Sequence, residues 1–140
     1  MTFPNPAEEA KRWLRFARAD LLLVEDLVNS PHHPPHIACY HAQQAVEKAL
    51  KAILVYLQMR FPFSHDLDEI RNLVPSTWTV PVVHQDLSWL RQWAVEGRYP
   101  GNWPEATDRD AQTAASQARA VWETVLDDLD AHGLDVSAFR

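Results

Sequence analysis

The chain has 140 residues, which corresponds to one ordinary domain with enough length to bury a single core. Hydrophobic residues make up 46% and charged residues 23%, so the composition excludes an intrinsically disordered chain. The net charge of −6 argues against broad binding to nucleic acid, because phosphate neutralisation requires clustered lysines and arginines.

The location of the protein is predicted from what the sequence lacks. Cys39 is the single cysteine, so no internal disulfide can form and the chain does not require an oxidising compartment. The first residues are polar and include two prolines, unlike a signal peptide. No apolar stretch is long enough for a transmembrane helix. We therefore expect a cytoplasmic protein that does not enter a membrane.

Prolines divide the chain into proline-free runs, and only three glycines occur, which together favour helices over strands. The first run predicts a helix over residues 6–28, since apolar side chains recur at steps of three and four. The second run predicts the longest helix, over residues 36–60, with Pro62 limiting its end. Its apolar positions, from Cys39 to Leu57, share one face.

Three further helices are expected in the second half of the chain. A short one covers residues 66–74, with Ser64 as its cap, and another covers residues 82–96, where Gly97 is a stop signal. The last covers residues 105–131. The sequence thus predicts a single all-α domain over residues 1–140, an antiparallel up-down bundle of about five helices, four long and one short. The alanine-rich second and fifth helices should pack together or form a dimer seam.

One face of the second helix carries the most informative polar residues. Four of them are spaced three, four and three residues apart, and therefore lie in one line: His41, Gln44, Lys48 and Lys51. An imidazole, an amide and two ammonium groups could hold the base and phosphate of a nucleotide. The alternative interpretation is a solvated helix face, on which Glu47 and Lys51 form an ion pair four residues apart.

A histidine-rich loop precedes this helix and suggests a metal site. It contains His32, His33 and His36, with Cys39 three residues further on. Imidazole and thiolate bind zinc, but two prolines stiffen the loop and no second pair of ligands completes four. Cys39 also lies on the apolar face of its helix, where a free cysteine is usually a core residue. We therefore expect no metal.

Arg98 and Tyr99 follow the fourth expected helix, and an arginine beside an aromatic ring suits a phosphate group. The alternative is a surface arginine near a helix C-terminus. Glycine-rich phosphate loops and nucleophile triads are absent from the sequence, and the adjacent acids Asp127 and Asp128 are spaced as a solvated helix face. Residue chemistry alone therefore indicates no enzyme class.

Two segments resemble the HEPN family, the higher eukaryotes and prokaryotes nucleotide-binding domain. Residues 40–52 resemble its long-helix signature, in which a His/Gln stretch is followed by Ala, Glu-Lys and Leu-Lys-Ala. Ser64-His65-Asp66-Leu67 resembles the family's His-Asp-Leu at the start of the next helix. Residues 17–21, Arg98-Tyr99-Pro100 and the alanine-rich last helix are also similar to the family.

The resemblance implies an all-α bundle, frequent homodimers and, in many bacterial members, a minimal nucleotidyltransferase partner in a toxin–antitoxin or related two-part system. Some members are metal-independent ribonucleases that use an arginine followed four to six residues later by a histidine. Arg98 suits that arginine, but residues 103–105 are Trp, Pro and Glu. Without the histidine, the expected proton-transfer partner is missing.

The sequence therefore predicts a non-catalytic HEPN protein that forms a homodimer and binds a nucleotide or assists a nucleotidyltransferase, with no resident cofactor and no RNA ligand. The expected nucleotide contacts are His41, Gln44, Lys48, Lys51, Arg98 and Tyr99. Two alternatives stay open. One is a ribonuclease toxin with an altered Arg–His motif, using Arg98 with His41 or His65. The other is an interaction module without a nucleotide.

Overall fold

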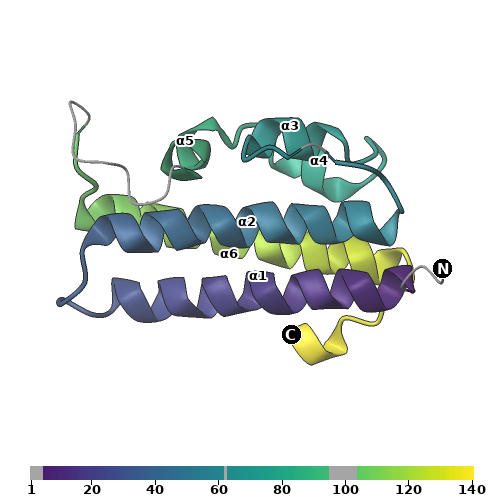
Figure 1. Ribbon diagram of the computed structural model, residues 1–140, viewed down its shortest axis with the longest axis horizontal. Helices are drawn as coiled ribbons and strands as arrows, with labels where there is room; N and C mark the ends of the chain where they lie inside the picture. Colours follow the sequence, from purple (N-terminus) through teal and green to yellow (C-terminus); the bar gives the residue numbers. More distant parts are fainter. Residues whose placement is uncertain (1–4, 62, 95–103) are drawn as a thin grey trace.

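The computed structural model of the chain describes residues 5–61, 63–94 and 104–140, and every regular element in these ranges is helical (Figure 1). Three helices are long: α1 (Pro6–Val28), α2 (Pro35–Tyr56) and α6 (Asp108–Ala131). Between α2 and α6 lie α3 (Leu67–Asn72), α4 (Thr79–Val83), α5 (Ser88–Arg91) and the 3₁₀ helix η1 (Gln92–Ala94). A second 3₁₀ helix, η2 (Ser137–Phe139), follows α6. The expected all-α fold is confirmed.

The long helices lie side by side, and α1 runs in the opposite direction to both α2 and α6 (Figure 1). The central helix is α2, which packs against α1 and α6. The short helices lie over the remaining side of the bundle, where α3 and α5 contact α2 and α4 contacts α6. Because these short helices separate α2 from α6 in the chain, α6 can start beside the beginning of α2 and follow it in the same direction.

The starts of the long helices follow from local sequence. Asn5 caps α1 by accepting a hydrogen bond from the N–H of Ala7 at 2.9 Å, and Pro6 occupies the first turn, where its missing N–H is tolerated. Thr107 and Asp110 form a reciprocal capping box at the start of α6. The expected bounds of the first helix are confirmed, and α6 begins three residues later than expected.

The end of α2 and the cap of α3 differ from expectation. The second helix stops at Tyr56, and not at residue 60, because Gln58 adopts a left-handed conformation with φ of 56° and turns the chain out of the helix. The cap of α3 is Asp66 rather than Ser64. The Asp66 carboxylate accepts hydrogen bonds from two N–H groups of the first turn, at 3.0 and 3.2 Å. The cap places the start of α3 at Leu67, and the helix ends at Asn72, two residues before the expected end.

The helix expected over residues 82–96 is interrupted. The first two residues of the expected helix are the last two of α4, which ends at Val83, and the chain becomes helical again only at Ser88. Residues 95 and 96 lie outside the described ranges.

The buried carboxylate of Asp128 on α6 accepts hydrogen bonds from the first two N–H groups of α4, both at 2.9 Å, so α4 starts at Thr79, before the expected helix. Asp128 is therefore a buried tether, and its expected place on a solvated face is wrong. Between α4 and α5, the carboxylate of Asp68 accepts the N–H of Leu87 at 2.9 Å.

Buried apolar side chains from α1, α2, α6 and the short helices form one core cluster. The alanines expected to face inward on α6 are all buried: Ala111, Ala114 and Ala118. Since α2 and α6 pack against each other, as one of the two expected outcomes, these alanine-rich faces lie inside the chain. Among the described residues, no helix combines the length and apolar character needed to cross a bilayer.

Candidate functional site

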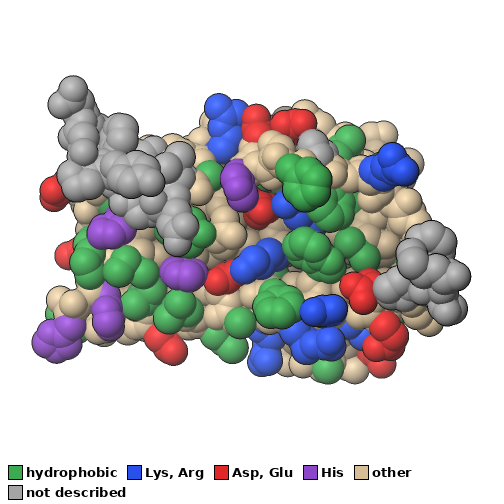
Figure 2. Space-filling model, in the orientation of Figure 1, with side chains coloured by type: hydrophobic (Ala, Val, Ile, Leu, Met, Phe, Trp, Pro, Cys, Tyr) green, Lys and Arg blue, Asp and Glu red, His purple; other side chains and the backbone are tan. Residues whose placement is uncertain are grey.

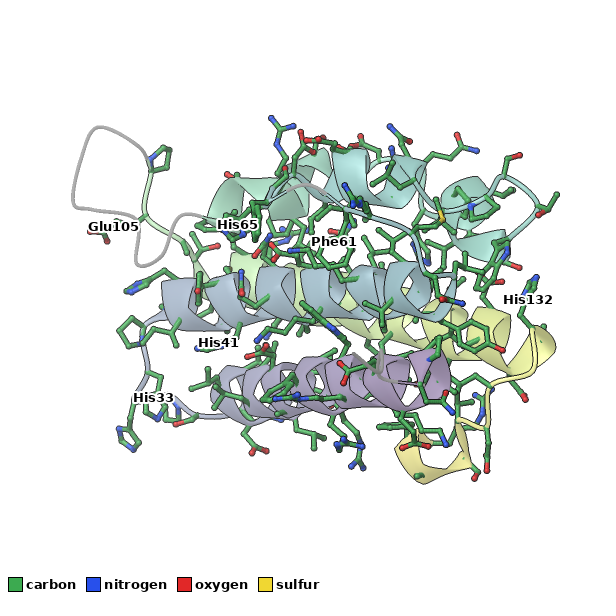
Figure 3. The ribbon with its side chains drawn as sticks, turned by 45° about the vertical axis from the view of Figure 1, so that its right-hand side comes forward. His33, His41, Phe61, His65, Glu105 and His132 are labelled. Carbon is green, nitrogen blue, oxygen red and sulfur yellow. The ribbon has the colours of Figure 1, made fainter. Side chains whose placement is uncertain are left out.

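The candidate site lies on the sides of α2 that face α1 and the connection between α2 and α3. His41 lies between α1 and α2, while His65 and Phe61 come from that connection (Figure 3). Figure 2 shows histidine, acidic and basic side chains beside one another near the middle of this face, with apolar side chains around them. The polar line predicted along α2 is therefore part of a mixed surface that includes carboxylates from elsewhere.

Asp20 of α1 holds two of the predicted ligand residues. Its Oδ1 lies 2.9 Å from Nδ1 of His41, and its Oδ2 accepts a hydrogen bond from Nζ of Lys48 at 2.6 Å. The side chains are largely covered, with exposed fractions of 13% for Asp20, 28% for His41 and 27% for Lys48. One carboxylate thus fixes an imidazole and an ammonium side by side, and Lys48 keeps further N–H donors for a ligand.

Glu47 is the buried centre of a second cluster, the Glu47 cluster. Nζ of Lys51 donates to Oε2 of Glu47 at 3.0 Å, and Nδ1 of His65 lies 2.7 Å from Oε1. Gln43 donates to the same Oε1 at 3.2 Å and accepts a hydrogen bond from Gln44 at 2.6 Å. The ion pair expected between Glu47 and Lys51 is confirmed, but both residues are buried, so its expected place on a solvated face is wrong.

The charge of Glu47 is set by this cluster. Burial raises its pKa, but the hydrogen bonds from His65, Lys51 and Gln43 and the charge of Lys51 outweigh burial, so the pKa lies below its ordinary value of 4.5. Lys51 is the buried counter-ion, and its Nζ also lies 5.2 Å from the centre of the Phe61 ring, in a cation–π contact. The charge of Lys51 therefore interacts with two groups of the chain itself, the Glu47 carboxylate and the Phe61 ring.

A groove beside Lys48 adds aromatic surface to the site. Its volume is about 290 Å³, and it is lined by Glu9, Arg12, Trp13, Phe16 and Lys48. The ring of Trp13 packs edge-on against Phe61, with centroids 5.8 Å apart, whereas Phe16 is mostly exposed. Aromatic rings beside cations suit a flat ring that carries a phosphate, and Glu9 offers an acceptor for amino or hydroxyl groups.

The family model of the HEPN domain matches residues 10–129 of the chain. This chain belongs to the HEPN family. The match covers most of α1, all of α2 and nearly all of α6, so the HEPN domain includes most of the two helices that build the candidate site.

Two known proteins are similar to this HEPN chain. The protein of Methanocaldococcus jannaschii named "Putative toxin MJ1304" is 28% identical over 133 residues, which cover 84% of this chain and 86% of that protein. The crystal structure of TT1696 from Thermus thermophilus has a TM-score of 0.72 at 23% identity, and the likeness covers 85% of this chain and 97% of that one. The second likeness concerns the fold alone.

The predicted ligand residues on α2 of this HEPN protein fall into two groups. His41 and Lys48 share the carboxylate of Asp20, whereas Gln44 and Lys51 belong to the Glu47 cluster. The other two predicted residues lie outside the described ranges: Arg98 and Tyr99. The four predicted residues of α2 therefore do not form one site, because two of them contact Asp20 and the other two contact Gln43 and Glu47.

Sequence reasoning missed Asp20, Gln43 and Trp13 as members of the site. The contacts of Asp20 join positions 21 and 28 residues apart, which the spacing within one helix cannot reveal. Asp20 does stand in the segment that resembles the family's first helix, and that segment was the available signal. Trp13 carried no signal beyond its place in an amphipathic helix.

The histidine loop before α2 is separate from this site. Cys39 is buried in the core, as expected for an apolar helix face. Within the described residues, no three His, Cys, Asp or Glu side chains are grouped so that they could hold a metal ion.

Proposed function

We propose that this HEPN protein is the toxin-like subunit of a two-part system and that it binds a nucleotide between α1 and α2. The observation that carries the proposal is the position of Lys48, which is fixed by Asp20 beside His41 and also lines the groove with Trp13. A phosphate would accept hydrogen bonds from Lys48 and His41, and the base would lie against Trp13. The relative named as a toxin supports the two-part system.

Gln44 and Lys51 have a different part in this proposal. Lys51 is buried and its charge is neutralised by Glu47. Its ammonium group therefore stabilises α2 and the position of the Phe61 ring, and does not bind the phosphate. The side-chain amide of Gln44 donates a hydrogen bond to Gln43 and orients the cluster around Glu47. We keep Arg98 and Tyr99 as proposed contacts, because an arginine beside an aromatic ring suits a phosphate.

Binding without RNA cleavage follows from the residues after Arg98. Residues 103–105 are Trp, Pro and Glu, so no histidine occupies the position at which a proton-transfer partner would be needed. We propose a minimal nucleotidyltransferase as the partner and the cytoplasm as the location, as the family resemblance implies.

Calorimetric titration of the purified protein with ATP, GTP and UTP tests the site. At least one nucleotide should bind, and Lys48→Ala and His41→Ala should each weaken binding by about tenfold, the value of one charge-assisted hydrogen bond. Arg109→Ala, which removes a cation from α6 instead, is the matched control and should bind as the wild type does. Equal binding by Lys48→Ala and wild type would rule out this site.

RNA cleavage is the second candidate function, and His65 favours it. Its Nδ1 lies 2.7 Å from the Glu47 carboxylate while its side chain is 65% exposed, so a carboxylate orients an imidazole that solvent and substrate can reach. Metal-free cleavage of RNA that is lost in His65→Asn would support this function. Absence of cleavage at every pH from about 6 to 8, where histidine changes charge, would exclude it.

The third candidate is an interaction module without a nucleotide. Capture of a nucleotidyltransferase by a protein that binds none of the three nucleotides would favour it.

A further inference from the structure

A hollow of about 400 Å³ lies between α1 and residues 134–140, the segment that follows α6. This segment includes η2, which lies beside α1 on the side of the bundle opposite to the short helices α3, α4 and α5 (Figure 1). Pockets for small molecules have volumes of about 300 to 1,000 Å³, so the hollow has the size of a small-ligand site. It shares no lining residue with the groove beside Lys48.

The segment after α6 is anchored to the bundle, so its wall of the hollow is preformed. Val136 and Phe139 are buried, and the ring of Phe139 packs edge-on against Trp122 of α6, with centroids 6.4 Å apart. The guanidinium group of Arg140 donates a hydrogen bond to Asp127 of α6 at 2.8 Å. A ligand would therefore bind without having to order the segment first.

The wall on α1 is cationic in its first half. Lys11, Arg15 and Arg18 are spaced four and three residues apart, so they lie on one face of the helix. Arg15 and Arg18 are exposed, and neither forms a hydrogen bond or ion pair with another residue that the structure describes. Both guanidinium groups therefore keep their N–H donors for an anion.

Lys11 differs from the two arginines because carboxylates already balance its charge. Its Nζ lies 3.6 Å from the carboxylate of Glu8. Across the hollow, hydrogen bonds from Ser137 and, to a smaller extent, the charge of Lys11 hold the pKa of Asp135 below its ordinary value of 3.8. The positive charges that lack a counter-ion in the hollow are thus those of Arg15 and Arg18.

The rest of the hollow is mainly apolar. Ala19 and Leu22 continue the face of α1 that carries Arg15, at four and seven residues beyond it. Ala138 and Phe139 belong to the opposite wall. An apolar group placed between these walls would be removed from water. Two free guanidinium groups beside apolar walls therefore suit a small molecule that is anionic at one end and apolar at the other.

We propose that the hollow binds a phosphate monoester of a small apolar group, with the phosphate on Arg15 and Arg18 and the apolar group against Leu22 and Phe139. A phosphate monoester carries about two negative charges at pH 7, which matches the two guanidinium charges. A carboxylate would neutralise only one of them. The inference is independent of nucleotide binding beside Lys48, because the two sites have different linings.

The carboxylates beside the hollow argue against an RNA strand as the occupant. A strand extends beyond the two arginines and would bring further phosphates close to Glu8 or Asp135, which would repel them. A single phosphate on Arg15 and Arg18 avoids this repulsion.

Calorimetric titration of the purified protein with phenyl phosphate tests the site. Wild type should bind it, and Arg15→Ala and Arg18→Ala should each weaken binding by about tenfold, the value of one charge-assisted hydrogen bond. Benzoate carries a single charge and inorganic phosphate has no ring, so each should bind at least about tenfold more weakly than phenyl phosphate. Arg109→Ala on α6 is the matched control and should bind as the wild type does.

Ala19→Phe tests the location without removing a charge. Ala19 is exposed on α1, so the fold can accommodate the larger ring, which fills the hollow and should abolish binding of phenyl phosphate. In an NMR titration of wild type with the same compound, the backbone amide signals of Ser137 and Ala138 should shift, and the ring signals of His41 should not.

Failure of wild type to bind phenyl phosphate would overturn the proposal, as would equal binding by wild type and the two arginine variants. Equal affinity for benzoate would overturn the assignment of a phosphate, and equal affinity for inorganic phosphate would overturn the role of the apolar walls. A shift at His41 without one at Ser137 would place the compound beside Lys48 and overturn this site. Displacement of phenyl phosphate by an RNA oligonucleotide that requires Arg15 would overturn it in favour of RNA.

Discussion

Asp20, Glu47 and Asp128 are carboxylates whose oxygens are occupied by hydrogen bonds within the chain. Asp20 joins α1 to two residues of α2, and Glu47 forms hydrogen bonds with three side chains. Asp128 accepts hydrogen bonds from the first two N–H groups of α4. A covered carboxylate is costly unless such bonds are made, so each of these residues is a point where one substitution should have a large effect.

Glu47→Gln should destabilise the protein by roughly 3 kcal/mol, because it leaves the buried ammonium of Lys51 without its counter-ion. Glu123→Gln is the matched control: Glu123 is also ion-paired, with Arg119, but its side chain is 51% exposed, and the loss should stay below about 1 kcal/mol. Urea unfolding of the two variants measures the difference. Equal losses would show that the Glu47 cluster contributes no more than a surface pair.

The same residue predicts a pH dependence. The pKa of Glu47 is lower in the folded protein than its ordinary value of 4.5, so the unfolded chain binds more protons between the two values. The contribution of Glu47 to stability is therefore present above about pH 4.5 and is lost as the pH falls through the folded pKa. Stability should decline less steeply on acidification in Glu47→Gln than in wild type, and parallel declines would contradict this assignment.

At the scale of elements, α4 depends on a residue of a distant helix. Asp128→Ala should cost about 2 kcal/mol or more, because two N–H groups of α4 lose their acceptor in a buried place. Its neighbour Asp127, whose side chain is 68% exposed, provides the control, and Asp127→Ala should change stability by no more than about 0.5 kcal/mol. Thermal and urea unfolding compare the two. A mild effect of Asp128→Ala would mean that α4 does not need this tether.

The long helices could be predicted from the sequence because their signals are local. Prolines and caps near their starts and apolar side chains at steps of three and four set α1, α2 and α6. The region from α4 to η1 could not be predicted in the same way. The start of α4 is set by Asp128, which accepts the N–H of Thr79 from 49 residues away, and the break before α5 lies where Asp68 accepts the N–H of Leu87 at 2.9 Å.

The candidate site likewise has a part that the sequence predicts from local spacing and a part that depends on contacts between distant segments. Spacing within α2 placed His41 and Lys48 together, as they are in the structure. It could not show that Glu47 and Lys51 are covered by the connection between α2 and α3, because burial of a polar face depends on segments that the helix pattern does not contain.

At the scale of the whole molecule, two sides of α1 differ in the residues that they present. The side toward α2 carries Asp20 and the groove with Trp13, and the outer side carries the exposed side chains of Leu22 and Leu23. His132 lies far from His41, at the opposite end of the bundle from the start of α2, where it stacks on Trp78 with ring centroids 3.8 Å apart (Figure 3). It therefore serves as an internal reference for ligand binding.

The histidine ring signals in an NMR titration with nucleotide test the proposed binding site most directly. We predict that the ring signals of His41 shift on addition of the nucleotide that binds, that those of His132 do not, and that Lys48→Ala requires about ten times more nucleotide for the same His41 shift. An unchanged His41 signal at saturating nucleotide, or a His41 titration with the same midpoint in Lys48→Ala and wild type, would contradict a nucleotide site between α1 and α2.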